Sequence, residues 1–206
     1  MATQKCTQTI PATLYGLLLP SQQLSITELL KYPMPAILSS CEFKDINHYI
    51  NDTPPTSTGN THTISCIPIP PESVVQKLQD AIKYKDKSTS SIKCPHTQTS
   101  SANTADATYP LWIVSYWEQL IAIKQVCKRW AAAKERMQER RCNLKDQEAE
   151  SGALIDRVFM TLSCLPWSGH IQGFTSNSEE EISSLTSYIS EKWLTGKHAN
   201  QMLDLL

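Results

Sequence analysis

The segment 110–148 constrains the fold of this chain more than any other, because its apolar residues recur at intervals of three and four. That period places them on one face of an α-helix. A continuous helix of this length would extend about 55 Å, longer than most helices of globular domains. We therefore expect it to project or to pair with another helix. The residues that carry the period are Trp112, Ile113, Trp117, Leu120, Ile121, Lys124, Cys127 and Trp130.

Shorter helices are predicted before this segment. Ser25 and Glu28 have the spacing of a capping box and introduce a short helix. Pro71 can open a second helix, which runs to about Tyr84. Its apolar positions share one face, as expected for a surface helix that packs on a core: they are Val74, Val75, Leu78 and Ile82.

Two more helices are predicted after the long segment. Ser151 can cap the first, which Pro166 closes before the turn Trp167-Ser168-Gly169. The second begins with another capping box, Ser178-Glu179-Glu180-Glu181, whose acids suit the first turn of a helix. Strand signals are scattered, with one example at 64–69.

The predicted fold class is therefore mainly α: a long central helix plus shorter helices, with disordered Ser/Thr/Pro-rich connections. We divide the chain into a small helical segment (1–50), a linker (51–70), a helix (71–85), a disordered linker (86–108), a helical region with the long helix (109–164), a turn plus capped helix (165–193) and the start of a truncated domain (194–206).

Composition narrows the functional classes. The chain has 19 basic and 20 acidic side chains, so it is not a globally basic nucleic-acid binder. Seven evenly spread cysteines are an odd number and favour a reduced intracellular protein, nuclear or cytoplasmic, over a disulfide framework. No apolar run approaches the ~20 residues of a membrane span.

Metal and catalytic chemistry have little support in the sequence. His62 and Cys66, with Cys94 and His96, are ligand types for zinc, but their spacing is unlike that of compact zinc sites. The chain lacks a nucleophile elbow, a P-loop and a dinucleotide-binding glycine motif. We therefore predict no catalytic residue, no metal and no cofactor.

A basic stretch offers a possible binding surface. Eight basic residues lie between Lys124 and Lys145, opposed only by Glu135 and Glu139. Such a stripe can contact phosphates, although a solvated helix face has the same pattern. The tryptophans of the same helix suit either a core or partner anchors. The candidate contact residues are Trp112, Trp117, Lys124, Lys128, Arg129, Trp130, Arg136, Arg140 and Arg141.

Two segments carry a family resemblance. The first is Tyr-Pro-Leu-Trp-Ile-Val-Ser-Tyr-Trp at 109–117, with Trp130 thirteen residues on. The second is Leu-Pro-Trp-Ser-Gly-His-Ile-Gln-Gly-Phe at 165–174, followed by Trp-Leu-Thr at 193–195 and His-Ala-Asn-Gln-Met-Leu-Asp-Leu-Leu at 198–206. In order and spacing they resemble the region just before the ubiquitin-like-protein (SUMO-type) processing cysteine protease domain of transposon-associated mushroom-fungus proteins.

The resemblance implies that residues 194–206 begin the first helix of that protease domain. Its catalytic residues would then follow Leu206, and none can be assigned in this chain. On this reading the chain is the non-catalytic N-terminal part of such a protein, and its partner would be the missing protease domain or another protein. The alternative is a free-standing helical interaction module that binds a protein or nucleic acid through the 110–148 helix.

Overall fold

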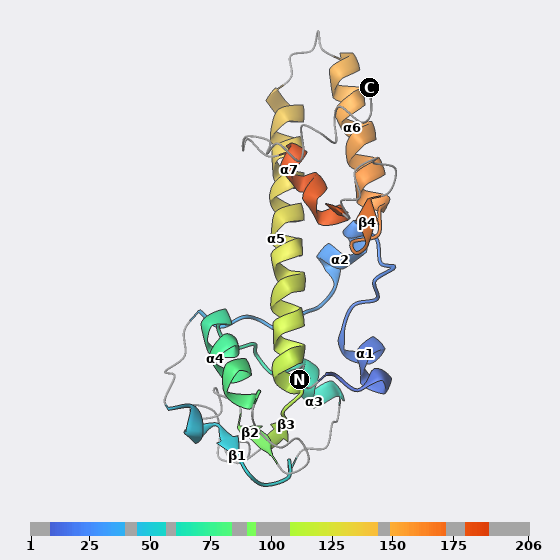
Figure 1. Cartoon of the computed structure of the whole chain (residues 1–206). Coiled ribbons are helices and arrows are strands. Elements are labelled where there is room, and N and C mark those ends of the chain that lie inside the picture. Colours follow the sequence, from blue (N-terminus) through green and yellow to red (C-terminus); the bar gives the residue numbers. More distant parts are fainter. Residues whose placement is uncertain are drawn as a thin grey trace, which may run out of the picture. The chain divides into compact units, whose positions relative to one another are not determined.

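A computed structural model describes residues 9–39, 45–56, 61–83, 90–93, 108–143, 149–171 and 180–189. It is mainly helical, with the long central helix α5 (Ile113–Asn143) and several shorter helices, which confirms the predicted fold class (Figure 1). The 31 residues of α5 correspond to a length of about 46 Å. No helix in these ranges is long and apolar enough to cross a membrane.

The chain divides into two compact units. Unit 1 contains residues 1–19 and 33–123, and unit 2 contains residues 20–32 and 124–206. The division therefore falls inside α5, between Ile123 and Lys124. Residues 20–32, which the sequence places in a single N-terminal segment 1–50, instead belong to the same unit as the C-terminal half of the chain.

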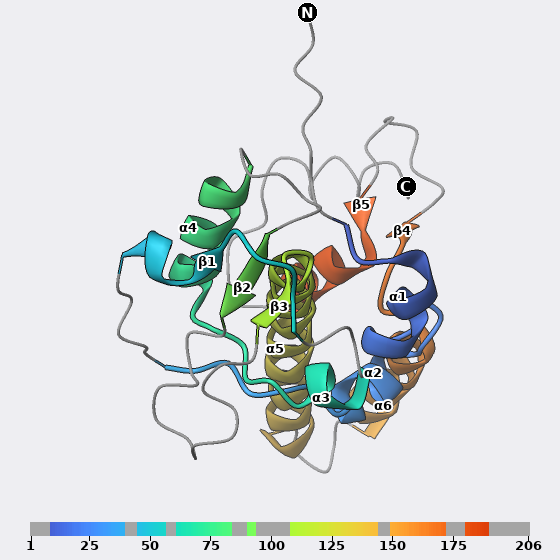
Figure 2. The same ribbon diagram turned by 90° about the horizontal axis from the view of Figure 1, so that it is seen from below.

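Unit 1 is built on a small antiparallel sheet. Its strands are β1 (Ile50–Asn51), β2 (Ser91–Lys93) and β3 (Thr108–Pro110), in the order β1-β2-β3 (Figure 2). The register sets Ile92 opposite Ile50 on one side and Tyr109 on the other. Beyond the sheet, the backbone N–H of Thr56 donates to the Thr108 hydroxyl at 2.9 Å, and the Thr108 N–H donates to the Thr56 hydroxyl at 3.0 Å.

Four short helical elements complete unit 1: α1 (Ala12–Leu18), the 3-10 helix η1 (Ile46–His48), α3 (Thr61–Ser65) and α4 (Glu72–Ile82). The helix α1 packs against α3, and α4 packs against η1. The predicted apolar face of α4 is confirmed, because Val74, Val75, Leu78 and Ile82 are all buried. The first turns of α5 supply the largest buried side chain, Trp117, which is completely inaccessible.

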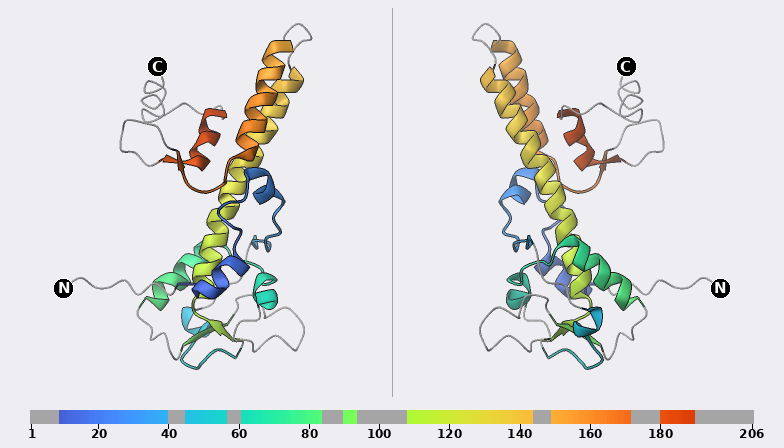
Figure 3. Two further views of the ribbon diagram at one scale, coloured as in Figure 1. Left: turned by 90° about the vertical axis from the view of Figure 1, so that its right-hand side faces the viewer. Right: turned by 90° about the vertical axis from the view of Figure 1, so that its left-hand side faces the viewer.

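Unit 2 combines the second half of α5 with α2 (Ile26–Lys31), α6 (Ala149–Cys164), a 3-10 helix η3 (Ile182–Leu185) and α7 (Thr186–Ile189). A two-stranded ribbon of β4 (His170–Ile171) and β5 (Glu180–Glu181) precedes η3. Both views of Figure 3 show α6 running alongside this half of α5. Its core centres on Ile26, Trp130, Ala133 and Ile182.

The helix α2 is held in unit 2 by hydrogen bonds to the end of α6 and the turn after it. Ile26 N–H donates to the carbonyl of Leu165 at 2.9 Å. Trp167 donates twice, from its backbone N–H to the Leu24 carbonyl (3.0 Å) and from its indole N–H to the Ser21 carbonyl (2.8 Å). These hydrogen bonds join segments about 140 residues apart, and Trp167 donates two of them.

The predicted capping box of α2 is confirmed. The Ser25 hydroxyl accepts a hydrogen bond from the Glu28 backbone N–H at 3.2 Å, and the Glu28 carboxylate accepts one from the Ser25 backbone N–H at 2.8 Å. Two backbone donors that the helix itself cannot satisfy therefore have partners.

Two predicted linkers contain structure that the sequence did not reveal. The segment 51–70 includes α3, and its Ile64 and Ile69 are fully buried. The segment 86–108 includes β2, whose Ile92 is also fully buried. In both segments a few buried isoleucines are enough to hold the backbone in a defined structure, because backbone hydrogen bonds to distant segments provide the other stabilising contacts. The parts of 86–108 at 86–89 and 94–107 lie outside the described residues.

Three predicted helix starts are wrong. The long helix begins at Ile113 rather than 110, because residues 108–110 pair with β2. Ser151 lies within α6, which begins at Ala149, and so does not cap it. Glu180 and Glu181 form β5 opposite His170 and Ile171 rather than a first helical turn. Ser178, Glu179 and residues 194–206 lie outside the described part of the chain.

Candidate functional site

The second half of α5, from Lys124 to Asn143, carries most of the predicted contact residues. Its inner face is apolar: Trp130, Ala133 and Met137 are buried at spacings of three and four, as a helix that packs on a core requires. Side chains from α2, α6, β4, η3 and α7 pack around this face, among them Leu30, Leu162, Ile171, Leu185 and Ile189. The polar side chains of this half of α5 occupy the rest of the helix circumference, away from the apolar face.

The basic residues do not form one continuous face. At 100° per residue, Arg129, Arg136 and Arg140 fall within about 40° of one another. We call these three residues the basic edge. No acidic residue of 124–143 lies in this sector, whereas Glu135 and Glu139 share the outward face with Lys124 and Lys128. Positive charge is therefore balanced on the outward face and unbalanced on the basic edge.

Exposure differs among these side chains. Lys128, Arg129, Arg140 and Arg141 are exposed, whereas Lys124 and Arg136 are half-buried. One guanidinium nitrogen of Arg136, Nη1, is enclosed and has no hydrogen-bond partner. The middle member of the basic edge is thus partly fixed by packing, and the two outer members reach solvent. Lys145, which the sequence counts with this stretch, lies outside the described residues.

Arg141 has a separate role at the end of α5. Its Nε donates to the Asp156 carboxylate of α6 at 3.2 Å, and the two side chains are 50% and 60% exposed. The guanidinium also covers Gly152, where a Cβ would meet Arg141 Cζ and Nη1 at 2.9 Å. Arg141 therefore joins α5 to α6, which makes it less available for a partner than Arg129 or Arg140.

Two of the three tryptophans among the candidate contact residues, Trp117 and Trp130, are core residues. Trp117 is completely buried in unit 1 and Trp130 is 4% exposed in unit 2. Of the two alternatives left by the sequence, core packing therefore holds for both of them, and neither presents its ring at the surface. Trp112, in the turn before α5, is half-buried.

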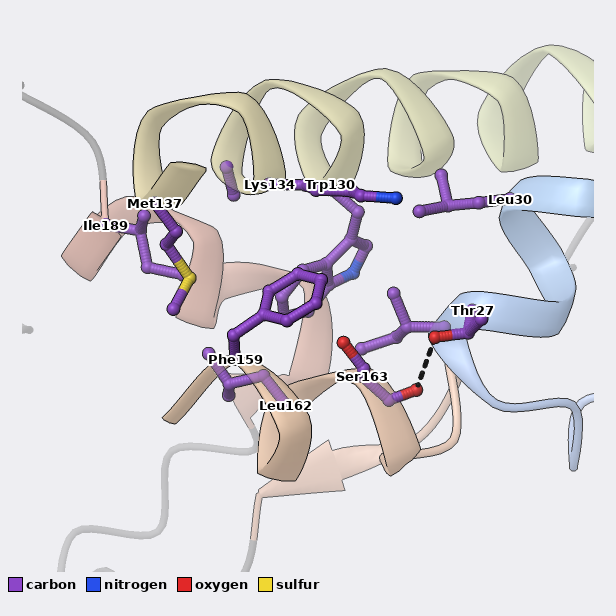
Figure 4. A pocket seen from close by; sticks show the side chains of 11 residues that line it. Thr27, Leu30, Trp130, Lys134, Met137, Phe159, Leu162, Ser163 and Ile189 are labelled. Carbon is purple, nitrogen blue, oxygen red and sulfur yellow. Dashed lines mark hydrogen bonds between the residues drawn. The ribbon is translucent and has the colours of Figure 1, made fainter. Parts of the chain in front are cut away.

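A small cavity adjoins Trp130. Figure 4 shows this side chain reaching from α5 into the space that α2, α6 and α7 enclose. The cavity volume is about 40 Å³. Its polar lining is limited to Thr27, Ser163 and Lys134, and the Thr27 hydroxyl already donates to the Ser163 carbonyl at 3.2 Å. The apolar lining residues are Ile26, Leu30, Trp130, Ala133, Met137, Phe159, Leu162 and Ile189.

Four cysteines lie in the described part of the chain. Among the described residues, Cys66, Cys127, Cys142 and Cys164 are all free. Burial raises the pKa of the half-buried Cys127 thiol, an effect that the nearby Lys124 opposes only in part. A raised pKa lowers the fraction of thiolate, which is the nucleophilic form. The Cys127 thiol is therefore less suited to act as a nucleophile than a thiol with an ordinary pKa.

No set of three metal-ligating side chains comes together in the described part of the chain. His62 lies within α3 and Cys66 directly after it, while Cys94 and His96 fall outside the described residues.

Sequence reasoning did not find the contribution of α2 to this site. Ile26, Thr27 and Leu30 line the cavity next to residues a hundred or more positions later in the chain. The capping box predicts that α2 exists, but it carries no information about what α2 packs against. No protein-family model matches the chain, and neither the curated proteins nor the solved structures that were compared provide a match.

Proposed function

We propose that this chain is a helical interaction module without catalytic activity of its own, which docks an anionic partner through the basic edge of α5. The observation that supports the proposal is the segregation of charge on that helix. Arg129 and Arg140 reach solvent on a sector that has no acidic residue between 124 and 143, while Glu135 and Glu139 of the same half of α5 face another direction. Three guanidinium groups along one line suit a polyanion such as nucleic acid better than a single small anion.

Binding to a short DNA duplex at several salt concentrations tests this function. Each phosphate contact contributes a slope of about −0.9 to log K against log salt. The double variant Arg129→Gln/Arg140→Gln should therefore flatten the slope by about 2. The control Lys128→Gln/Arg157→Gln removes the same charge from exposed positions of α5 and α6 outside the basic edge. Equal effects of the two double variants, or no binding at low salt, would contradict the proposal.

We further propose that the module belongs to proteins with a SUMO-type cysteine protease domain and lies before that domain. The motifs at 109–117 and 165–174 support this placement. Within the second motif, the Trp167 indole N–H donates a hydrogen bond to the segment that leads into α2. The motif therefore has a structural role that would be the same in a longer protein of this kind.

Two measurements test this placement. Sequencing the transcript across the Leu206 codon should reveal a frame that continues into a domain with His, Asp and Cys. The 206-residue chain itself should not release a fluorophore from the C-terminus of a SUMO-type modifier. If the chain releases the fluorophore, and alkylation of its cysteines abolishes that release, then the chain has catalytic activity and this part of the proposal is wrong.

A further inference from the structure

The helix α6 carries apolar side chains on two different faces. One face packs inside unit 2, where Phe159 and Leu162 line the cavity (Figure 4). On another face Leu154 and Val158 lie one turn apart and are 55% and 41% exposed. At 100° per residue, the centres of the two faces are about 90° apart. A helix that is apolar on more than one face is normally covered on each of them, so we expect the exposed face to have a partner.

The residues of the exposed face are spaced as in a helix that pairs with another helix. Ser151, Leu154, Val158 and Thr161 follow one another at intervals of three, four and three. All four are exposed, and we call them the α6 stripe. These intervals are those of the contact positions in a coiled coil. The stripe extends over about 15 Å of the helix, which is enough for a short helix pair.

Two opposite charges border the α6 stripe on the same side. Glu150 and Arg157 are both exposed, and they lie about 10.5 Å apart along the helix and within about 20° of each other around it. With described residues, neither of them forms an ion pair. Both occupy the type of position, beside the contact line, that carries the ion pairs between the helices of a coiled coil.

The order of these charges is complementary to a second copy of the same helix. When two α6 helices lie antiparallel, Glu150 of one copy is opposite Arg157 of the other, and the two-fold axis repeats this pair. The axis then passes halfway between positions 150 and 157, next to Leu154. In a parallel pair in register, like charges lie at the same height and no such pairing arises. The charges therefore favour an antiparallel, symmetric contact.

We propose that α6 is a self-association surface, on which two copies of this chain pair antiparallel along the α6 stripe with two reciprocal ion pairs between Glu150 and Arg157. Because Leu154 and Val158 are the only large apolar side chains of the stripe, the dimer is weak, with a dissociation constant on the order of 0.1–1 mM. The basic edge lies on α5, so this inference does not depend on the proposed function. DNA titrations at micromolar protein concentration measure the monomer, and Arg157→Gln remains a valid control there.

Sedimentation equilibrium of the full chain, at concentrations from about 0.02 to 1 mM, tests the surface. The average mass should rise with concentration from that of a monomer toward that of a dimer. Leu154→Glu places two carboxylates together at the axis and should leave only monomer over this range. The control Met160→Glu makes a similar change at another exposed apolar residue of α6, outside the stripe, and should leave the association unchanged.

Reversal of the two charges tests the antiparallel pairing itself. Glu150→Arg alone, or Arg157→Glu alone, places like charges opposite each other twice in each dimer and should weaken association about three- to tenfold. The double variant Glu150→Arg/Arg157→Glu restores both pairs with exchanged signs. Its dissociation constant should return to within about twofold of that of the natural protein.

Any of three results would overturn the proposal. The first is a chain that remains monomeric at about 1 mM. The second is a dimer that Leu154→Glu leaves intact, which would place the interface elsewhere on the chain. The third is a double charge variant that associates no better than the two single variants. If Leu154→Glu fails to fold, the charge variants still decide the outcome, because Glu150 and Arg157 are exposed.

Discussion

The attachment of α2 to unit 2 depends on Trp167, and replacing this residue by phenylalanine isolates one bond of that attachment. The variant keeps an aromatic ring on the turn but loses the indole N–H that donates to the Ser21 carbonyl at 2.8 Å. The bond lies at an exposed position, so water can partly satisfy the abandoned carbonyl. We therefore expect a loss of about 1 kcal/mol in the free energy that holds residues 20–32 in place.

Native-state hydrogen exchange measures this loss at the relevant site. The Ile26 N–H is protected by the Leu165 carbonyl across the same attachment, at 2.9 Å. A loss of about 1 kcal/mol should accelerate its exchange about fivefold. The Ile69 N–H, which donates to the Ala36 carbonyl of unit 1 at 2.8 Å, should exchange at an unchanged rate.

A matched variant separates a local effect from a general one. Trp112→Phe makes the same chemical change at a half-buried tryptophan of unit 1. It should leave the Ile26 exchange rate as it is. The reasoning is refuted if Trp167→Phe leaves Ile26 exchange unchanged in a folded protein, or if Trp112→Phe accelerates it as much.

Three further predictions concern stability. Hydrogen bonds from the Ser25 backbone N–H and then from its hydroxyl lower the pKa of Glu28, so the stabilisation they give is full above the unfolded pKa of ~4.3 and is lost as pH falls through the folded pKa. The difference in unfolding free energy between the natural protein and Glu28→Gln, measured by urea denaturation, should therefore disappear in acid. A difference that does not change with pH would contradict this. Gly152→Ala should gain about 0.5–1 kcal/mol of helix propensity, but its Cβ displaces the guanidinium of Arg141. In a double-mutant cycle, the gain in stability should therefore appear only when Arg141→Ala is also present. A large loss of stability from Gly152→Ala both with and without Arg141→Ala would show that the backbone is displaced instead. Ile92→Ala should cost about 2–5 kcal/mol by denaturant titration, against a small effect for the neighbouring Lys93→Ala, and similar effects of the two would show that β2 is not central to unit 1.

The features that sequence reasoning predicted are those that depend on neighbours in the chain. The apolar period of α5, the apolar face of α4 and the Ser25–Glu28 capping box all involve residues within a few turns of one another. The sheet of unit 1 was missed because its strands have two or three residues each, too few to display an alternating pattern.

The candidate site was predictable only in part. The positions of Arg129, Arg136 and Arg140 on one helix, and hence the basic edge, follow from the helical period alone. The cavity does not, because its walls come from four helices and include α2, which precedes α6 by more than a hundred residues. The choice between core and surface for Trp130 also required the packing of these distant segments, since an indole at helical spacing suits either place.

The discontinuous make-up of unit 2 sets an order of events during synthesis. The helix α2 leaves the ribosome early. The Leu165 carbonyl, which accepts the hydrogen bond from the first N–H of α2 at Ile26, is synthesised 139 residues later (165 − 26 = 139). At about 5–20 residues per second, that interval is about 7–28 s. During this time the apolar residues Ile26 and Leu29 have no completed core to join. We therefore expect α2 to lack its native partners until α6 and the Trp167 turn have emerged, and this interval is the time during which a chaperone could bind it.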